Sequence, residues 1–238
     1  MWTYPPRRIL VPVDFREASA RALQLAGSLA RTFDAPVLAL HAETFEAPPY
    51  FTSDQVRTIE RQRRAARTAA ASYLQRHAER LAGVPVSPVI SDAPPAEAIL
   101  EAARSQDLIV MGTHGRRGPS RWWVGSVAER VVRDAQIPVL VVRAMPAPSA
   151  QPFSRVAVIA GRGTFDGPAR RYAKGLASAF GGELNREDAR TVKASSLAGA
   201  TLVVMARPAV TSLLGLPQAA SERALRACRR PVLFIPPV

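Results

Sequence analysis

Short apolar runs alternate with longer amphipathic stretches over the first 143 residues. The runs are only a few residues long and apolar almost throughout, which is typical of strands buried on both faces of a sheet. They fall at residues 9–13, 36–41, 84–90, 108–111 and 138–142. The stretches between them repeat apolar residues at helical spacing. They predict helices at 17–33, 55–82, 94–104 and 125–135. This alternation predicts an α/β fold, an open, doubly wound parallel sheet with helices on both faces.

The second part of the chain repeats the first with a piece missing. Arg8 aligns with Arg155 and Glu129 with Glu222, so the offset falls from 147 to 93 residues along the repeat. The missing 54 residues correspond to the long helix, one strand and part of another strand. We therefore expect a first domain at 1–145 and a truncated copy at 153–238, joined by a proline-rich linker. Below, these are called the first half and the second half.

Charge and composition exclude few classes of function. The formal net charge of +13 could attract nucleic acid, acidic proteins or anionic lipid, but a solvated arginine-rich surface explains it more simply. No apolar run approaches the roughly 20 residues that span a bilayer. The start of the chain lacks the pattern of a signal peptide, and Cys228 is the single cysteine. These features predict a cytoplasmic protein.

The strand at 108–111 leads into a glycine-containing loop and then into a helix. The pattern is Gly112-x2-Gly115-x9-Gly125-Ser126. Glycine lets the backbone come close to a ligand, and the free amides and dipole of a helix N-terminus attract phosphate. Ser126 adds a hydroxyl donor. Because open α/β sheets bind ligands at the carboxyl ends of their strands, the pattern favours a phosphate site here. Turn glycines without a ligand remain the alternative.

The residues around this motif resemble the signature of the universal stress protein family. The matching segments are Val11–Phe15 with Ser19, Asp107–Arg116, Gly125–Arg130 and Pro138–Val142. The resemblance covers residues 7–143, and a weaker copy covers 154–238. It implies a sheet in the order 3-2-1-4-5. It also implies ATP, with or without Mg²⁺, as the ligand, because members with the glycine motif often bind ATP.

The resemblance further implies a set of nucleotide-binding residues. Those expected on the adenine side are Pro12, Val13, Asp14, Leu40 and His41. Gly112 would approach the ribose. Those expected around the phosphates are Gly115, Arg116, Gly125, Ser126 and Val127. Asp14 could instead cap the following helix or loop, and the two roles are compatible.

The second half departs from the motif at every position that matters. Asp14 corresponds to Gly161, and Gly125-Ser126 corresponds to Gln218-Ala219. Alignment of Met111 with Met205 puts Ala206 and Ala209 in place of the two loop glycines. We therefore expect one nucleotide per chain, bound by the first half.

The sequence leaves several functions open. The favoured one is an adenine nucleotide-binding stress or signalling protein, and the main alternative is a nucleotide-free adaptor that binds a protein partner through the same fold. A nucleic-acid-associated protein is supported only by charge. No nucleophile, base and orienting acid form a recognisable constellation, so any ATP hydrolysis would be slow. The final strands of the two halves are expected to lie side by side as a pseudo-dimer, because an exposed apolar edge strand needs a partner. A further homodimer stays open.

Overall fold

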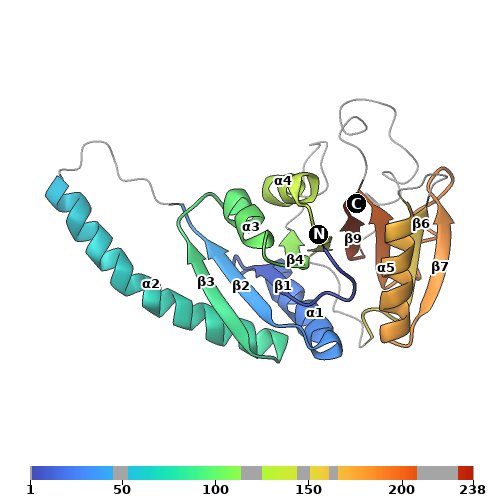
Figure 1. Ribbon diagram of the computed structural model, residues 1–238, viewed down its shortest axis with the longest axis horizontal. Helices are drawn as coiled ribbons and strands as arrows, with labels where there is room; N and C mark the ends of the chain where they lie inside the picture. The colour runs from blue at the N-terminus through green and yellow to red at the C-terminus, as the bar shows by residue number, and fades with distance from the viewer. Residues whose placement is uncertain are drawn as a thin grey trace.

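The strands and helices predicted for the first half are all present (Figure 1). The computed structural model describes residues 2–44, 53–113, 125–143, 151–160, 166–207 and 230–237. The strands of the first half are β1 (Ile9–Pro12), β2 (Val37–Ala42), β3 (Val86–Ser91), β4 (Leu108–Thr113) and β5 (Val139–Arg143). Its helices are α1 (Glu17–Phe33), α2 (Ser53–Ala82), α3 (Pro95–Ala103) and α4 (Ser126–Asp134). None of the helices described is long and apolar enough to cross a membrane.

The second half contributes four more strands and one helix to the part of the chain that the structure describes. The strands are β6 (Arg155–Ala160), β7 (Glu183–Asp188), β8 (Leu202–Ala206) and β9 (Val232–Ile235). The helix is α5 (Asp166–Ala179). All described strands join one sheet in the order β3-β2-β1-β4-β5-β9-β8-β6-β7. Its first five strands confirm the predicted order 3-2-1-4-5.

The two halves meet where β5 pairs with β9. This pairing is antiparallel, with Val139 opposite Phe234 and Val141 opposite Val232, whereas every other strand pair is parallel. The expected adjacency of the final strands is therefore observed. Without β9, the apolar strand β5 would end the sheet with unpaired backbone groups.

Side chains of the sheet alternate between two core layers. One layer packs the sheet against α1 and the C-terminal part of α2, and it continues across the second half under α5. The other layer packs it against α3 and α4 and also continues into the second half. We call the two sides of the sheet the α1/α2 face and the α3/α4 face. Each layer contains buried residues from both halves, so neither half closes its core alone.

The missing piece of the second half differs from the predicted one. The counterpart of β2 is present as β7, and the segment at 189–201 between β7 and β8 contains only turns. The long helix, one strand and a short helix are thus absent, rather than the long helix, one strand and part of another. Val192, Leu197 and Ala200 from this turn segment are buried in the α3/α4 layer, so a short loop supplies part of the apolar surface that a helix supplies in the first half.

The segment at residues 2–4, called the N-terminal strap below, lies between the two halves. The ring of Tyr4 packs against Phe33 of α1 at 5.8 Å between centroids and against Tyr172 of α5 at 4.8 Å. Trp2 packs on Tyr172 at 5.8 Å. A Cβ at Gly175 would lie 2.2 Å from the Tyr4 ring, so the ring needs a glycine at this point of α5. The strap thus adds an aromatic contact to the strand pairing.

We expect ionisation of these tyrosines to lower the free energy of unfolding at alkaline pH. Burial raises the pKa of Tyr4 to about 12, and burial raises the pKa of Tyr172 as well. Since tyrosine in an unfolded chain ionises near pH 10, the unfolded state loses protons first, and the free energy of unfolding falls as pH rises above about 10. Tyr172→Phe should flatten this fall between about pH 10 and 12, as measured by urea unfolding.

The control for this experiment is Tyr73→Phe, because the Tyr73 ring is 55% exposed. It should leave the pH dependence unchanged. At pH 7 Tyr172→Phe should cost little stability, since its buried hydroxyl has no hydrogen-bond partner in the described part of the chain. Identical alkaline slopes for wild type and Tyr172→Phe would contradict the expectation.

Candidate functional site

The predicted phosphate site lies where α4 begins, beside the carboxyl end of β4. Thr113, the last residue of β4, is 3% exposed, and its hydroxyl oxygen accepts a hydrogen bond of 3.1 Å from the Gly125 N–H. Gly125 is the N-cap residue of α4 and has no side chain to cap it. Thr113 stands within the motif, but the spacing of the glycines gives no sign of its role. It fixes the start of α4 to the end of the strand.

The first turn of α4 presents groups that suit an anion. The carbonyl oxygen of Gly125 already accepts the N–H of Glu129 at 2.9 Å, so the helix is formed from its first turn. Within the described part of the chain no side-chain cap bonds to its first amides, and Ser126 is exposed. Val127 packs its side chain against the α3/α4 core, which leaves its backbone rather than its side chain to contact a ligand. Uncapped amides at a helix N-terminus bind phosphate readily.

The residues predicted on the adenine side divide between the two faces of the sheet. Val13 belongs to the α1/α2 core, whereas Leu40 belongs to the α3/α4 core, the side that carries α4. The imidazole Nδ1 of His41 lies 2.7 Å from the Val13 carbonyl oxygen, to which it donates. His41 therefore links β2 to the loop after β1. Ala42, which follows it, packs on the α3/α4 core and was missed by the sequence analysis.

Asp14 takes part in a tight turn ahead of α1. One carboxylate oxygen accepts the Arg16 N–H at 3.0 Å, which confirms the alternative that Asp14 caps the following loop. Pro12 ends β1 half-buried, and Asp14 is exposed two residues later. Both thus lie at the carboxyl edge of the sheet, where the predicted site is expected.

Phe15 follows Asp14 with a left-handed backbone, φ 59°, which is unusual and costly for a bulky residue. Its ring packs on His41 at 4.9 Å, on Tyr73 at 5.4 Å and on His77 at 5.2 Å between centroids. Burial lowers the pKa of His77, and the nearby Arg80 lowers it further, so the neutral ring is favoured in this cluster. These ring contacts hold the strained turn that contains Asp14.

Gly112 has a packing role that its place in the motif did not reveal. A Cβ at this position would lie 2.3 Å from the Ala18 carbonyl carbon and 2.4 Å from the Ser19 nitrogen. The helix α1 thus sits directly against the backbone of β4, and only glycine leaves room for it. Gly115 and Arg116, the two residues of this loop that are predicted to contact the phosphates, lie outside the described residues.

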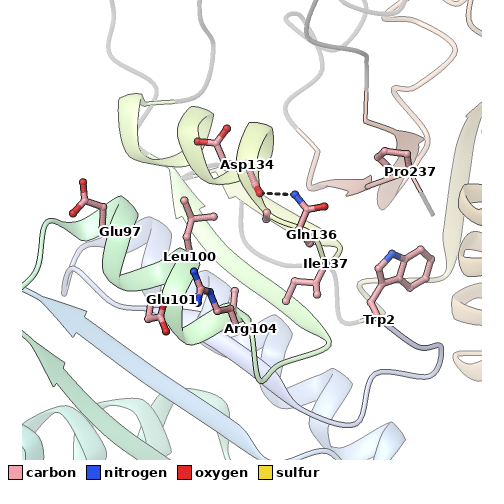
Figure 2. A pocket seen from close by; sticks show the side chains of 11 residues that line it. Trp2, Glu97, Leu100, Glu101, Arg104, Asp134, Gln136, Ile137 and Pro237 are labelled. Atoms are coloured by element: carbon pink, nitrogen blue, oxygen red, sulfur yellow. Dashed lines mark hydrogen bonds and ion pairs between the residues drawn. The ribbon is translucent and has the colours of Figure 1, made fainter.

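A cavity of 710 Å³ lies at the opposite edge of the sheet (Figure 2). The C-terminal ends of α3 and α4 line it, together with Trp2 near one end of the chain and Pro237 near the other. Glu97, Glu101 and Asp134 also line it. Helix C-termini and carboxylates both disfavour a phosphate. The start of α4 is therefore the better place for an anionic ligand.

The comparisons with known proteins agree with the fold and the motif. Residues 5–143 match the model of the universal stress protein family. The chain belongs to the universal stress protein family. A universal stress protein of Methanocaldococcus jannaschii is 33% identical over 147 residues, which is 58% of this chain and 82% of that protein. One from Thermus aquaticus is also 33% identical, over 58% of this chain and 98% of its own length.

The crystal structure of a universal stress protein from Archaeoglobus fulgidus is similar over almost the whole chain. Its TM-score is 0.68 at 19% identity, with 97% of this chain and 96% of that chain covered. At this identity the likeness concerns the fold alone. The likeness nevertheless extends beyond residues 5–143, which match the family model, and so includes the second half.

We expect Gly112→Ala to destabilise the fold, because its methyl group would collide with the backbone of α1. Overpacking of this kind typically costs about 1–3 kcal/mol, and backbone cannot give way as a flexible side chain can. Chemical denaturation measures the loss. Gly199→Ala is the control, since a Cβ there would meet nothing within 4 Å. Equal midpoints for Gly112→Ala and the control would contradict the tight α1–β4 contact.

Proposed function

We propose that the first half binds an adenine nucleotide, ATP, and that the protein acts in stress response or signalling by carrying it. The observation that carries this proposal is the start of α4, which Thr113 holds to the end of β4 and whose N-cap residue, Gly125, has no side chain to cap it. Some members of the universal stress protein family bind nucleotides such as ATP or cAMP. The family membership and the local chemistry therefore favour the same ligand.

In this proposal the phosphates lie against the first turn of α4. The backbone amides there and the exposed hydroxyl of Ser126 donate to phosphate oxygens. Gly115 and Arg116 complete the phosphate site. A guanidinium is well suited to this task because it can donate two parallel hydrogen bonds to a phosphate.

The adenine lies toward the carboxyl ends of β1 and β2. Pro12, Leu40 and Ala42 supply apolar surface at this edge. Asp14 accepts from the adenine amino group or a ribose hydroxyl while keeping its turn with Arg16. His41 and Val13 support this edge through their own hydrogen bond, with His41 acting through its contacts rather than as a direct ligand.

The second half binds no nucleotide in this proposal. At the end of β8 it has Ala206 and Arg207 where the first half has Gly112 and Thr113. The hydroxyl that anchors the helix start is thus replaced by a long cation. Titration of the full chain with ATP should therefore saturate at one nucleotide per chain.

We expect Gly115→Val combined with Ser126→Ala to abolish ATP binding while the fold stays intact. The valine would fill space that a phosphate needs, and the alanine removes a donor. A hydrogen bond to a charged group is worth about 1.5–3 kcal/mol, so affinity should fall by more than about tenfold. Calorimetry on the purified proteins measures it, and mass spectrometry identifies any nucleotide that copurifies.

The matched control is Gly199→Val with Ser105→Ala. A side chain at Gly199 would meet nothing within 4 Å. Among the described residues, the Ser105 hydroxyl bonds only locally: it donates to the Ala102 carbonyl and accepts from the Gln106 side chain. This pair should bind ATP as wild type does. A wild-type protein without measurable affinity for adenine nucleotides would instead favour the nucleotide-free adaptor.

We expect Asp14→Ala to weaken ATP by about fivefold, since one hydrogen bond is worth about 1 kcal/mol. Inorganic tripolyphosphate should be affected much less, because Asp14 lies on the adenine side. Asp188→Ala is the matched control: Asp188 closes the same kind of turn after β7, accepting the Arg190 N–H at 2.8 Å. Equal losses for ATP and tripolyphosphate would assign Asp14 a structural role only.

A further inference from the structure

The helix that carries the proposed phosphate site is held to the core by a few small apolar side chains. Of the residues in α4, only Ala128 and Val131 are buried, and Val127 and Val132 pack against the same core while partly exposed. The helix is only 9 residues long, which is too short to be stable without its surroundings. Polar contacts must therefore help to fix its position and direction.

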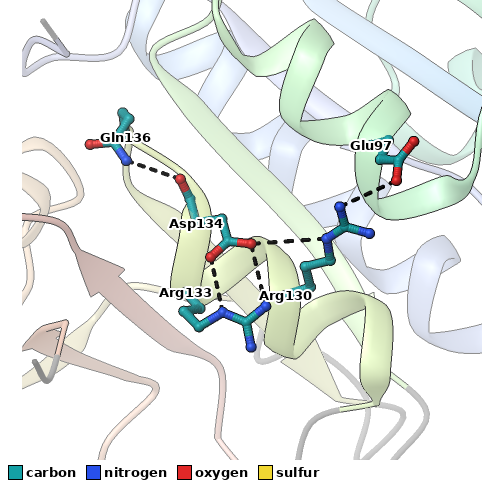
Figure 3. A network of polar contacts seen from close by, with 5 residues as sticks. All are labelled: Glu97, Arg130, Arg133, Asp134 and Gln136. Atoms are coloured by element: carbon teal, nitrogen blue, oxygen red, sulfur yellow. Dashed lines mark hydrogen bonds and ion pairs between the residues drawn. The ribbon is translucent and has the colours of Figure 1, made fainter. Parts of the chain in front are cut away.

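Some of these polar contacts join α4 to its neighbours in the first half (Figure 3). Arg130 reaches Glu97 of α3 at 3.3 Å and Asp134 at 3.9 Å. The Gln136 side chain donates to the Asp134 carbonyl oxygen at 3.0 Å, beyond the end of the helix. Arg130 and Glu97 are both about half exposed, and exposed ion pairs contribute little.

A stronger contact comes from the second half. Arg207, directly after β8, donates from its guanidinium to the carbonyl oxygens of Ala135 and, at 3.5 Å, Val132. Carbonyls at a helix C-terminus lack partners within the helix and carry a partial negative charge, so a cation that donates to them stabilises the helix. Burial lowers the pKa of Arg207 and Asp134 raises it, as expected for a half-buried cation beside a carboxylate.

The backbone of Arg207 is bonded to the neighbouring strand β9. Its N–H donates to the Ile235 carbonyl of β9 at 2.7 Å, and β9 pairs with β5. The guanidinium therefore projects from the end of β8, beside the strand β9 that joins the two halves. In the alignment of Met111 with Met205, Arg207 occupies the position of Thr113. Equivalent positions of the two halves thus hold opposite ends of the same helix: Thr113 the N-terminus of α4, and Arg207 its C-terminus.

We propose that Arg207 is a positioning residue for the nucleotide site, through which the second half holds α4 in the direction that its N-terminus needs to meet the phosphates. This inference rests on the proposed function. A helix that is already held in place pays less conformational entropy when the ligand binds, so preorganisation raises affinity. By linkage, a nucleotide bound at one end of α4 also tightens the contact at the other end.

The test uses the full chain with Arg207→Met and Arg207→Lys. Methionine keeps much of the apolar stem but no donor, whereas lysine keeps a charge that can donate to the same carbonyls. Hydrogen exchange should become faster in residues 126–134 of the methionine variant and return toward wild type in the lysine variant. Exchange in β5 and β9 should not change. Arg230→Met is the control, because Arg230 donates to Ala198 within the second half, at 2.8 Å.

Ligand affinities separate positioning from general destabilisation. Arg207→Met should weaken ATP by roughly three- to tenfold, comparable to the loss of one or two hydrogen bonds. Adenosine, which has no phosphates to meet α4, should bind as it does to wild type, as measured by competition or calorimetry.

Each outcome decides a different point. Unchanged exchange in α4 of the methionine variant would overturn the inference. Faster exchange with unchanged ATP affinity would also overturn it, and so would equal losses of affinity for ATP and adenosine. In each of these cases the proposed function would stand as long as the wild-type protein binds ATP. A wild-type protein that binds no ATP would overturn both.

Discussion

The short antiparallel ladder between β5 and β9 joins two sets of parallel strands into one sheet. It involves only three residue pairs, yet both core layers run across it. In the first half an apolar strand would otherwise be left as an open edge, which is a template for aggregation. In the second half the remaining four strands and single described helix are too few to bury much surface alone. The second half therefore covers the open edge of the first, and the first half supplies the core surface that the second half lacks.

The ladder also decides which parts of the two halves meet. Because β9 runs antiparallel to β5, the carboxyl end of β9 lies near the start of β5, where α4 has just ended. Arg207 follows β8, which is parallel to β9, so it arrives beside the C-terminus of α4. The N-terminal strap adds aromatic contacts with Phe33 and Tyr172 from the two halves. The second half is thus in contact with the far end of the helix that carries the candidate site.

The residues of the glycine motif have packing roles besides the ligand-binding role proposed for the motif. Gly112 is needed because α1 presses on the backbone of β4, and Thr113 is needed because its hydroxyl holds Gly125. The strained turn at Phe15 is held by rings from β2 and α2. The loss of the glycines and the hydroxyl in the second half fits this view. There the sheet is kept, and Arg207 makes a contact across the halves in place of a site.

The sequence by itself determined the elements of the first half. The family resemblance implied their order in the sheet, and the pairing of the final strands followed from the need of an apolar edge strand for a partner. Apolar runs and helical periodicity report burial directly, and the repeat transfers the same fold to the second half. It could not show β7, because an edge strand with five of six residues exposed has no apolar pattern. Nor could it show that Val13 and Leu40 lie on opposite faces of the sheet. The packing of α1 against Gly112 and the contact of Arg207 with the C-terminus of α4 were also beyond it. These depend on which atoms meet across elements far apart in the chain, and such distances are fixed only when the sheet and both core layers close.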